Sequence, residues 1–454
     1  MQIDNPYIQY MYSYPHKTAY RPLEGIDLKT FLACLSGQEN SLYFHIPFCQ
    51  YKCGYCNLFS LAGQPESVME QYVDAMERQA EQLSRELPAD TEFSDLTLGG
   101  GTPLLLPNHL LERVFRISED YFHFRSAPCP VSAGVSLNQS GKENPASKAG
   151  VHPVIAETSP NQTTKEKLWL LKEHGVTRLS IGVQSFQEKE LETLHRFHRA
   201  GTAKRALADI GKVGFSCVNI DLIYGIPGQT RESLLDSLEQ ALDFSPEELF
   251  IYPLYVKPGT ALYQQEVKRQ PEAFEMYQCV RERLKKEGYH SYSMRRFVKG
   301  AKEVQETSLC GFGNTISVGC GGRSYIGNLH FCTPYAVQQA HCMALVENYM
   351  QKNDYMSVDY GYLLSDEEQK RRYVIKHILF GQGILKKDYR QYFGGEAEQD
   401  FAPIAKWLKE GYAVSTKEHI TLTEQGIALS DYLGPQLISE EVREKMKAWK
   451  DAGA

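Results

Sequence analysis

Short β-branched or apolar runs alternate with longer amphipathic stretches from Ser41 to about Tyr292. This alternation is typical of repeated βα units around a parallel sheet, and we count six units. The pattern therefore predicts an α/β fold containing a partial (βα)6 barrel. Strands are expected at Ser41–His45, Asp95–Leu98, Val151–Ala156, Arg178–Ile181, Cys217–Leu222 and Leu249–Leu254, and helices at stretches such as Pro65–Arg85, Thr163–His174 and Arg231–Phe244.

The flanking segments depart from this order. An arm rich in Tyr and His occupies residues 1–40, and a stretch rich in Ser, Gly, Pro and Asn at 126–151 is expected to form a flexible surface insertion. After Leu363, helical stretches lead to two short alternating runs around a polar turn. We therefore predict an N-terminal arm (1–40), a (βα)6 core (41–330) and a small helical and winged C-terminal domain (331–454).

Composition narrows the class of protein. The chain has 454 residues, of which 42% are hydrophobic and 23% charged, and no run approaches the roughly 18 apolar residues of a membrane helix. The N-terminus lacks the basic and apolar segments of a secretory signal, so we expect a cytoplasmic protein with reduced thiols. A net charge of -7 without a Lys/Arg-rich block predicts no nucleic-acid partner.

Three of the eleven cysteines lie on one short loop after the first predicted strand. Cys49, Cys53 and Cys56 follow a CxxxCxxC spacing, which lets all three thiols point at one centre. Three thiolates can bind three corners of a [4Fe–4S] cluster and leave the fourth iron open to another ligand. A zinc knuckle with His45 as its fourth ligand is the alternative, and we favour the cluster.

Further polar or side-chain-free positions follow the later strands, at the rim where barrel enzymes bind ligands. The second strand ends in Leu98-Gly-Gly-Gly-Thr-Pro103, which allows close approach to the backbone. A cap or loop hydrogen bond could explain each polar residue singly, but the series on one rim favours a ligand site. Its members are Glu157, Gln184, Asp221 and the segment from Tyr252 to Tyr255.

With these neighbours, the cysteine loop resembles the radical SAM (S-adenosylmethionine) superfamily and, within it, the HemN/HemW-like branch. The resemblance implies a [4Fe–4S] cluster and two SAM molecules. It implies that Tyr43 contacts the cluster-bound SAM, that Tyr55 lies beside the adenine or the second SAM, and that Gly100, Gly101 and Thr102 hold the SAM amino group. The residues implied to hold the two SAM molecules are Glu157, Gln184, Arg196 and Asp221.

Two further features extend the candidate site. The stretch from Gly319 to Ser324 resembles a glycine-rich turn of the same branch, and Cys320 within it is a candidate catalytic thiol, with a packing role as the alternative. Arg295 and Arg296 form a candidate anchor for an anionic or carbonyl-bearing substrate, but we favour a solvated surface pair.

Three functions compete within the branch. An oxygen-independent coproporphyrinogen III oxidase carries a fourth cysteine where this chain has Leu58, and a HemW-type haem chaperone lacks the long arm. We therefore expect a class C methyltransferase acting on an aromatic carbon such as C8 of the menaquinone ring, with the oxidase and the chaperone as alternatives. The expected partners are a small aromatic, quinone or tetrapyrrole substrate and a reductant such as flavodoxin or ferredoxin.

Overall fold

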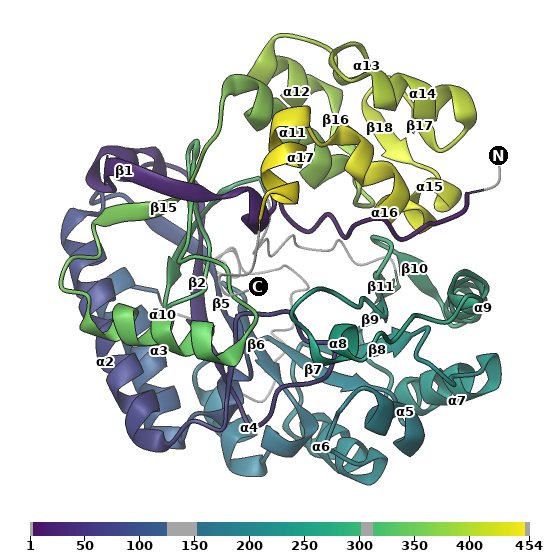
Figure 1. Cartoon of the computed structure of the whole chain (residues 1–454), viewed down its shortest axis with the longest axis horizontal. Helices are drawn as coiled ribbons and strands as arrows, with labels where there is room; N and C mark the ends of the chain where they lie inside the picture. The colour runs from purple at the N-terminus through teal and green to yellow at the C-terminus, as the bar shows by residue number, and fades with distance from the viewer. Residues whose placement is uncertain (1–2, 125–151, 301–311, 450–454) are drawn as a thin grey trace, which may run out of the picture.

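The computed structural model describes residues 3–124, 152–300 and 312–449, so the insertion expected at 126–151 lies outside the described residues. At its centre, six parallel strands pair side by side in chain order (Figure 1). The predicted partial (βα)6 barrel is confirmed. The strands are β2 (Glu39–Ile46), β5 (Glu92–Gly100), β6 (Val154–Thr158), β7 (Arg178–Gln184), β8 (Cys217–Tyr224) and β9 (Glu248–Pro253).

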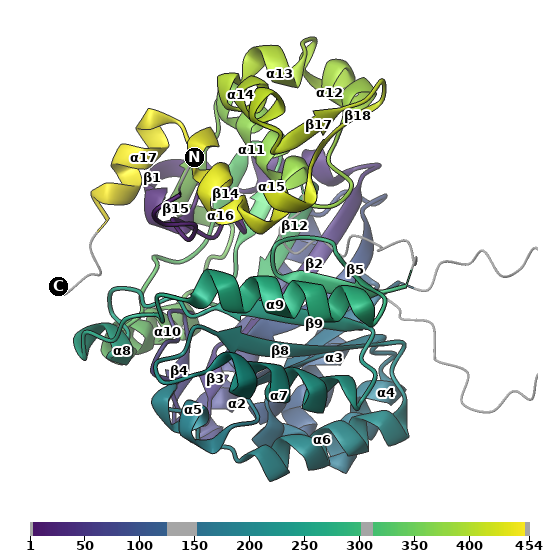
Figure 2. The ribbon, with the colours of Figure 1, turned by 90° about the vertical axis from the view of Figure 1, so that its right-hand side faces the viewer.

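Helices cover the outer face of these strands (Figure 2). In α2, the buried Met69, Val73, Met76 and Ala80 recur every three or four residues, which gives the helix one apolar face to lay on the sheet. The helices of this layer are α2 (Glu66–Glu86), α3 (Asn108–Phe122), α4 (Lys165–Glu173), α5 (Glu188–Thr193), α6 (Ala200–Val213), α7 (Arg231–Leu242) and α9 (Ala273–Lys286).

The inner face of the strands carries polar residues, as β8 illustrates. The apolar Ile220 and Leu222 alternate along the strand with the polar Asn219 and Asp221. Because side chains of a strand point to opposite faces in turn, the two polar residues share one face, and the Asn219 amide donates to Asp221 at 2.7 Å. This alternation directs the polar groups of the strands toward the site.

The sheet continues beyond the six strands on both sides, and the described residues contribute thirteen strands to it. Next to β2 come β12 (Asn314–Val318), β13 (Ser324–Ile326), β14 (Leu329–Phe331), β15 (Ser357–Leu363) and β1 (Arg21–Asp27), and next to β9 come β11 (Arg296–Lys299) and β10 (Tyr289–Ser291). The arm therefore supplies an edge strand, and the sheet runs past residue 330, where the sequence predicts a domain boundary.

The C-terminal helices pack around a second core that includes residues of the arm. Tyr14 and Tyr20 are fully buried there together with Trp407 and Phe401. The predicted alternating runs form the antiparallel pair β17 (Ala413–Ser415) and β18 (His419–Leu422), joined by β16 (Ile384–Leu385). The main helices are α11 (Asp366–Ile378), α12 (Lys386–Phe393), α14 (Ala402–Glu410) and α17 (Glu440–Lys447).

Candidate active site

The cysteine loop begins at the end of β2 and is held by main-chain hydrogen bonds. Strand β3 (Phe48–Cys49) pairs with β4 (Leu61–Ala62), which closes the loop at its base. Gly54 donates to the carbonyl of Leu194 at 2.9 Å, which ties the middle of the loop to the end of α5. The Cys49, Cys53 and Cys56 thiols are free and partly buried. The loop is therefore a fixed support for the three sulfurs.

The spacing of the sulfurs favours a cluster over zinc. Among the described residues, the only set of three potential ligands whose donor atoms all lie within 4.8 Å of one another is the exposed group Glu66, Glu70 and His109. Tetrahedral zinc would hold its sulfurs roughly 3.8 Å apart, given Zn–S bonds of about 2.3 Å. In a [4Fe–4S] cluster, by contrast, each cysteine binds a different iron, so the sulfurs lie farther apart.

His45 does not serve as a fourth ligand. Its ring nitrogens lie 3.1 Å from the Tyr43 hydroxyl and 3.2 Å from the carbonyl oxygen of Phe59. Burial lowers the pKa of His45 to about 4, so the ring is neutral and engaged within the protein. The zinc knuckle considered from the sequence therefore lacks the ligand that it requires.

Burial also disfavours negative charge on the thiols of the loop. It raises the pKa of Cys49 to about 12, and it raises the pKa of Cys56, with Cys53 adding to that shift. Three thiolates at this place need a positively charged partner, because a coordinating metal ion stabilises the deprotonated thiol. The donor set thus fits iron ions, and Cys49, Cys53 and Cys56 would hold the cluster.

Arg196 reaches the loop from the segment after α5. Its Nη1 lies 3.3 Å from the sulfur of Cys53, and its Nη2 donates to the carbonyl of Gly182. Its Nε is buried and has no hydrogen-bond partner. A buried donor without a partner is costly, and a guanidinium binds carboxylates well, so the geometry suits the carboxylate of SAM.

The glycines at the end of β5 let the chain approach itself closely. Gly101 donates to the carbonyl of Ile46 at 2.8 Å, and a Cβ on Gly101 would lie 2.6 Å from the carbonyl oxygen of Phe48. The Thr102 hydroxyl lies 3.8 Å from the sulfur of Cys49. The sequence predicts that a ligand can approach the backbone here. In the structure, the cysteine loop packs against the end of β5 at this place.

Two carboxylates lie on β6 and β8, the strands on either side of β7. Glu157 on β6 accepts from the backbone N–H of Gly100 at 3.3 Å. Burial, with Asp221 adding to it, raises the pKa of Glu157 to about 7, and burial raises the pKa of Asp221 on β8 to about 6. Asp221 raises the pKa of Glu157, which indicates that these two predicted residues lie close to each other. Acidic groups that are costly to ionise suit a site that binds hydrogen-bond donors or a cation.

Gln184 lies between these carboxylates, at the end of β7. It has a φ of +72°, and the pairing of β7 with β8 shifts register at this point. A positive φ is unusual for a residue other than glycine, and such strain is concentrated at ligand sites. Arg196, in the segment after α5, donates to Gly182 of the same strand, so the four implied SAM residues lie on the adjacent strands β6, β7 and β8 and on that segment.

Tyr55 and Tyr43 also lie at this rim. Tyr55 packs against a small apolar group that includes Leu194 and Leu262, and burial raises the pKa of Tyr55 while nearby Arg196 opposes the shift. The ring of Tyr43 lies over Gly99, 3.0 Å from the place of a Cβ there. Tyr55 is part of the cysteine loop, and the Tyr43 ring lies at the end of β5 beside the glycine motif, so both rings lie on the side where the sequence resemblance implies SAM.

Cys320 has a different environment from the one expected of a catalytic thiol. It is fully buried, its sulfur lies 3.6 Å from the carbonyl oxygen of Leu345, and burial raises its pKa far above the ordinary value. A buried, protonated thiol is a poor nucleophile. These contacts favour the packing role over the catalytic one.

Arg295 and Arg296 are not free to anchor a substrate. Arg295 pairs with Asp431 of the C-terminal domain in a fully buried contact, and Arg296 pairs with Glu248, which Arg178 also contacts at 2.8 Å. Both the solvated surface pair and the candidate anchor are therefore wrong, because Arg295 is buried, Arg296 is mostly buried and tertiary partners already neutralise both side chains. The sequence does not reveal these partners, since Asp431 lies more than a hundred residues away.

Lys17 of the arm lies near the cysteine loop and was missed from the sequence. Its Nζ is 3.5 Å from the centre of the Tyr335 ring. Burial, with Arg323 adding to it, lowers the pKa of Lys17 to about 7, while Cys332 and Cys56 oppose the shift. In the sequence, the only signal for this residue is that it is a single lysine within an aromatic segment. The arm thus brings a basic amine to the site, whose charged form is costly to bury.

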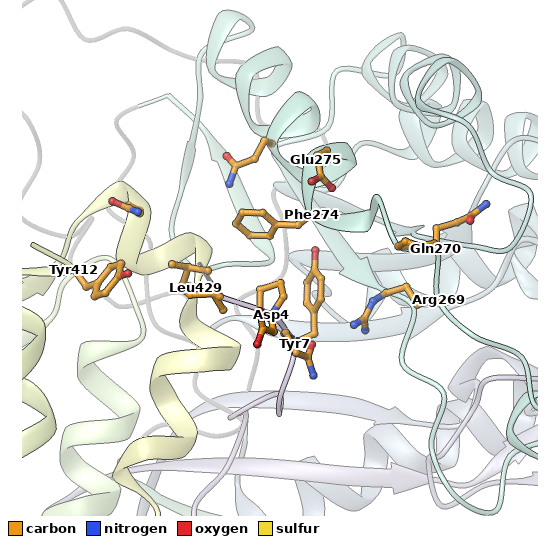
Figure 3. Close-up of a pocket in the computed structure, with 14 residues that line it drawn as sticks. Asp4, Tyr7, Arg269, Gln270, Phe274, Glu275, Tyr412 and Leu429 are labelled. Atoms are coloured by element: carbon orange, nitrogen blue, oxygen red, sulfur yellow. Dashed lines mark hydrogen bonds between the residues drawn. The ribbon is translucent and has the colours of Figure 1, made fainter. Parts of the chain in front are cut away.

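A separate pocket of about 530 Å³ lies at the start of the arm (Figure 3). Tyr7, Phe274 of α9 and Tyr412 of the C-terminal domain line it, and the guanidinium of Arg269 lies 4.0 Å from the Tyr7 ring centre. The pocket contains none of the predicted site residues. It marks the junction of the arm, α9 and the C-terminal domain.

Comparisons with known proteins agree with this geometry. A family model described as the radical SAM superfamily matches residues 43–241. The heme chaperone HemW of Bacillus subtilis is 26% identical over 402 residues, covering 86% of this chain and 97% of the relative. The heme chaperone HemW of Mycobacterium tuberculosis is 30% identical over 305 residues, covering 65% of this chain and 72% of the relative.

Among solved structures, coproporphyrinogen III oxidase (HemN) from Escherichia coli, a radical SAM enzyme, matches with a TM-score of 0.76. The match covers 94% of this chain and 96% of that chain at 22% identity, so it supports the fold. Within the described residues, none of the helices is both long and apolar enough to cross a membrane.

Proposed function

This chain belongs to the HemN/HemW-like branch of the radical SAM superfamily, and from that premise we propose that it is an enzyme acting on a carboxylate-bearing tetrapyrrole. Similar proteins are named for haem or coproporphyrinogen, and none of those reported above is named for a quinone or a methyl transfer. The tetrapyrrole alternatives are thus favoured over the menaquinone methyltransferase expected from the sequence.

The buried amine of Lys17 in the arm is the observation that carries the proposal. Lys17 is partly buried near the cysteine loop, and no carboxylate is among the groups that most affect its pKa. A buried cation is stabilised by an anionic partner, which a propionate of a tetrapyrrole can provide. Tyr335 and the aromatic residues of the arm supply flat apolar surfaces on which such a ring can stack.

The chain's own residues have distinct roles in this proposal. Bound at Cys49, Cys53 and Cys56, the cluster together with SAM supplies one-electron cleavage of the sulfonium and hence radical chemistry on the substrate. Arg196 binds the SAM carboxylate, and Glu157 and Asp221 accept hydrogen bonds from SAM. Lys17 positions the substrate above this arrangement.

The test uses protein reconstituted anaerobically with iron and sulfide. Incubation with SAM, dithionite and either coproporphyrinogen III or haem is followed by mass analysis of the tetrapyrrole. Loss of carboxyl groups or gain of a methyl, with consumption of SAM, supports an enzyme and identifies its reaction. Tight binding of unchanged haem without SAM consumption would replace the enzyme with a chaperone.

A variant tests the role of Lys17. We expect Lys17→Met to weaken tetrapyrrole binding by roughly tenfold, measured by absorbance titration, because a charge-assisted contact contributes about 1.5–3 kcal/mol. Iron content and SAM binding are expected to stay unchanged. Lys417→Met, at an exposed position of the C-terminal domain, is the matched control. If both variants bind the tetrapyrrole with equal affinity, Lys17 does not contact the substrate.

A further inference from the structure

We propose that the surface formed by Tyr51, Phe197 and the start of α6 is the docking site for a small acidic electron-carrier protein. Phe197 has an exposed fraction of 69%, the largest among the large hydrophobic side chains of the described residues. It packs edge to face on Tyr51, with ring centres 4.7 Å apart. An exposed aromatic pair of this kind is typical of the centre of a protein–protein interface.

The pair lies directly over the cysteine loop. Tyr51 lies on the loop, between Cys49 and Cys53, and Phe197 follows Arg196, whose Nη1 is 3.3 Å from the sulfur of Cys53. A carrier seated on Phe197 would thus be separated from a cluster ligand by a single residue. Because electron transfer slows steeply with distance, this is a favourable place on the surface to deliver an electron.

The charge around the pair favours an acidic partner. Exposed basic side chains occur at Lys189, Arg199, Lys204 and Arg205, on the segments that precede and follow Phe197 in the chain, against two exposed carboxylates at Glu188 and Glu192. On a straight helix, Arg205 lies about 9 Å along the axis from Arg199. Glu188 is already engaged, since it accepts from the backbone N–H of Ala200 at 3.1 Å. The whole chain carries a net charge of -7, so these basic segments are a local exception that would steer an acidic carrier.

The step is a transfer of one electron. The carrier's reduced flavin or iron–sulfur centre is oxidised by one electron, and the [4Fe–4S] cluster is reduced by one; no bond forms or breaks. The inference depends on the cluster and not on the identity of the tetrapyrrole, although it deepens the proposed function by naming the class of its redox partner.

Purified flavodoxin is the probe, tested against the reconstituted holoprotein. We expect Arg199→Glu combined with Lys204→Glu to weaken flavodoxin binding at least tenfold at low salt, measured by calorimetry, and to slow reduction by flavodoxin in stopped flow. Reduction by dithionite, iron content and SAM binding are expected to stay unchanged. The matched control is Lys409→Glu combined with Lys417→Glu, two exposed positions of the C-terminal domain.

A second variant tests the aromatic pair without changing charge. Phe197→Ser is expected to slow reduction by flavodoxin while leaving dithionite reduction intact. The inference is overturned if both variants bind flavodoxin as tightly as the control and are reduced by it as fast. It is also overturned if the protein self-associates and these variants abolish the self-association. If flavodoxin reduces the protein normally but no tetrapyrrole is altered, the docking surface is supported and the proposed substrate fails.

Discussion

At the scale of single residues, the site gathers groups whose charges are costly to bury. Burial raises the pKa of Cys49 to about 12 and that of Glu157 to about 7. The Nε of Arg196 is buried and has no hydrogen-bond partner. Such groups reduce the stability of the protein alone and become favourable when ligands of opposite charge bind. They are therefore the positions where substitutions separate binding from folding.

Cys53→Ala is expected to abolish cluster assembly and with it SAM cleavage, because a cube held by two thiolates loses one of its three protein ligands. Iron and sulfide analysis after reconstitution measures the effect. Cys320→Ala is the control, since Cys320 lies in the core, and it is expected to keep its iron. A full iron complement in Cys53→Ala would contradict the assignment of the cluster.

Glu157→Gln is expected to stabilise the protein at pH 8. The pKa of Glu157 in the folded protein, about 7, lies above its ordinary value of 4.5. The folded state therefore holds a proton that the unfolded state has lost, and stability falls by about 2–3 kcal/mol as the pH rises from about 4.5 to 7.

Glutamine removes this loss, so the difference in melting temperature between variant and parent should be largest at pH 8 and disappear near pH 4.5. Thermal unfolding of the ligand-free protein at several pH values measures it. Glu192→Gln, at an exposed position, is the control and should show no such dependence. A difference independent of pH would mean that Glu157 is not buried as described.

At the scale of elements, the end of β5 and the cysteine loop depend on each other. Gly101 and Thr102 donate to the carbonyls of Ile46 and Phe48, so the glycine motif fixes where the loop begins. The loop is closed in turn by the short pairing of β3 with β4. The positions of the sulfurs thus depend on backbone contacts as well as on cysteine spacing.

Gly101→Ala is expected to lower iron occupancy severalfold, because the added Cβ would lie 2.6 Å from a carbonyl oxygen and push the loop away from β5. Iron content and the absorbance of the reconstituted protein report the change. Gly211→Ala is the control, since a Cβ at this place in α6 meets nothing within 4 Å. Equal iron content in the two variants would show that the loop tolerates the displacement.

At the scale of the whole molecule, the arm and the C-terminal domain are joined to the (βα)6 unit. The arm contributes β1 to the sheet and Tyr14 and Tyr20 to the second core. Arg295, just before β11, pairs with Asp431, and the guanidinium lies 3.7 Å from the centre of the Tyr10 ring. One buried ion pair therefore connects three parts of the chain.

Asp431→Ala is expected to lower the free energy of unfolding by about 3–5 kcal/mol, since it leaves a buried arginine without its counter-ion. The melting temperature measures the loss. The double variant Arg295→Met with Asp431→Leu removes both charges and is expected to recover most of it. Equal destabilisation by the single and double variants would show that packing, and not charge, joins the parts.

The sequence by itself determined the features that depend on local order. Apolar periodicity places the six strands, and the spacing of Cys49, Cys53 and Cys56 indicates an iron–sulfur loop, because both signals are carried by neighbouring residues. The polar series at the strand ends predicts the rim that carries Glu157 and Asp221.

Only the tertiary structure decided which distant groups meet. It pairs Arg295 with Asp431, buries Cys320 and brings Lys17 to the cysteine loop. No periodicity encodes these contacts, since each depends on how separate elements pack. The tertiary structure sets which charges are neutralised and which side chains are buried. These two properties settle whether a side chain is available for chemistry.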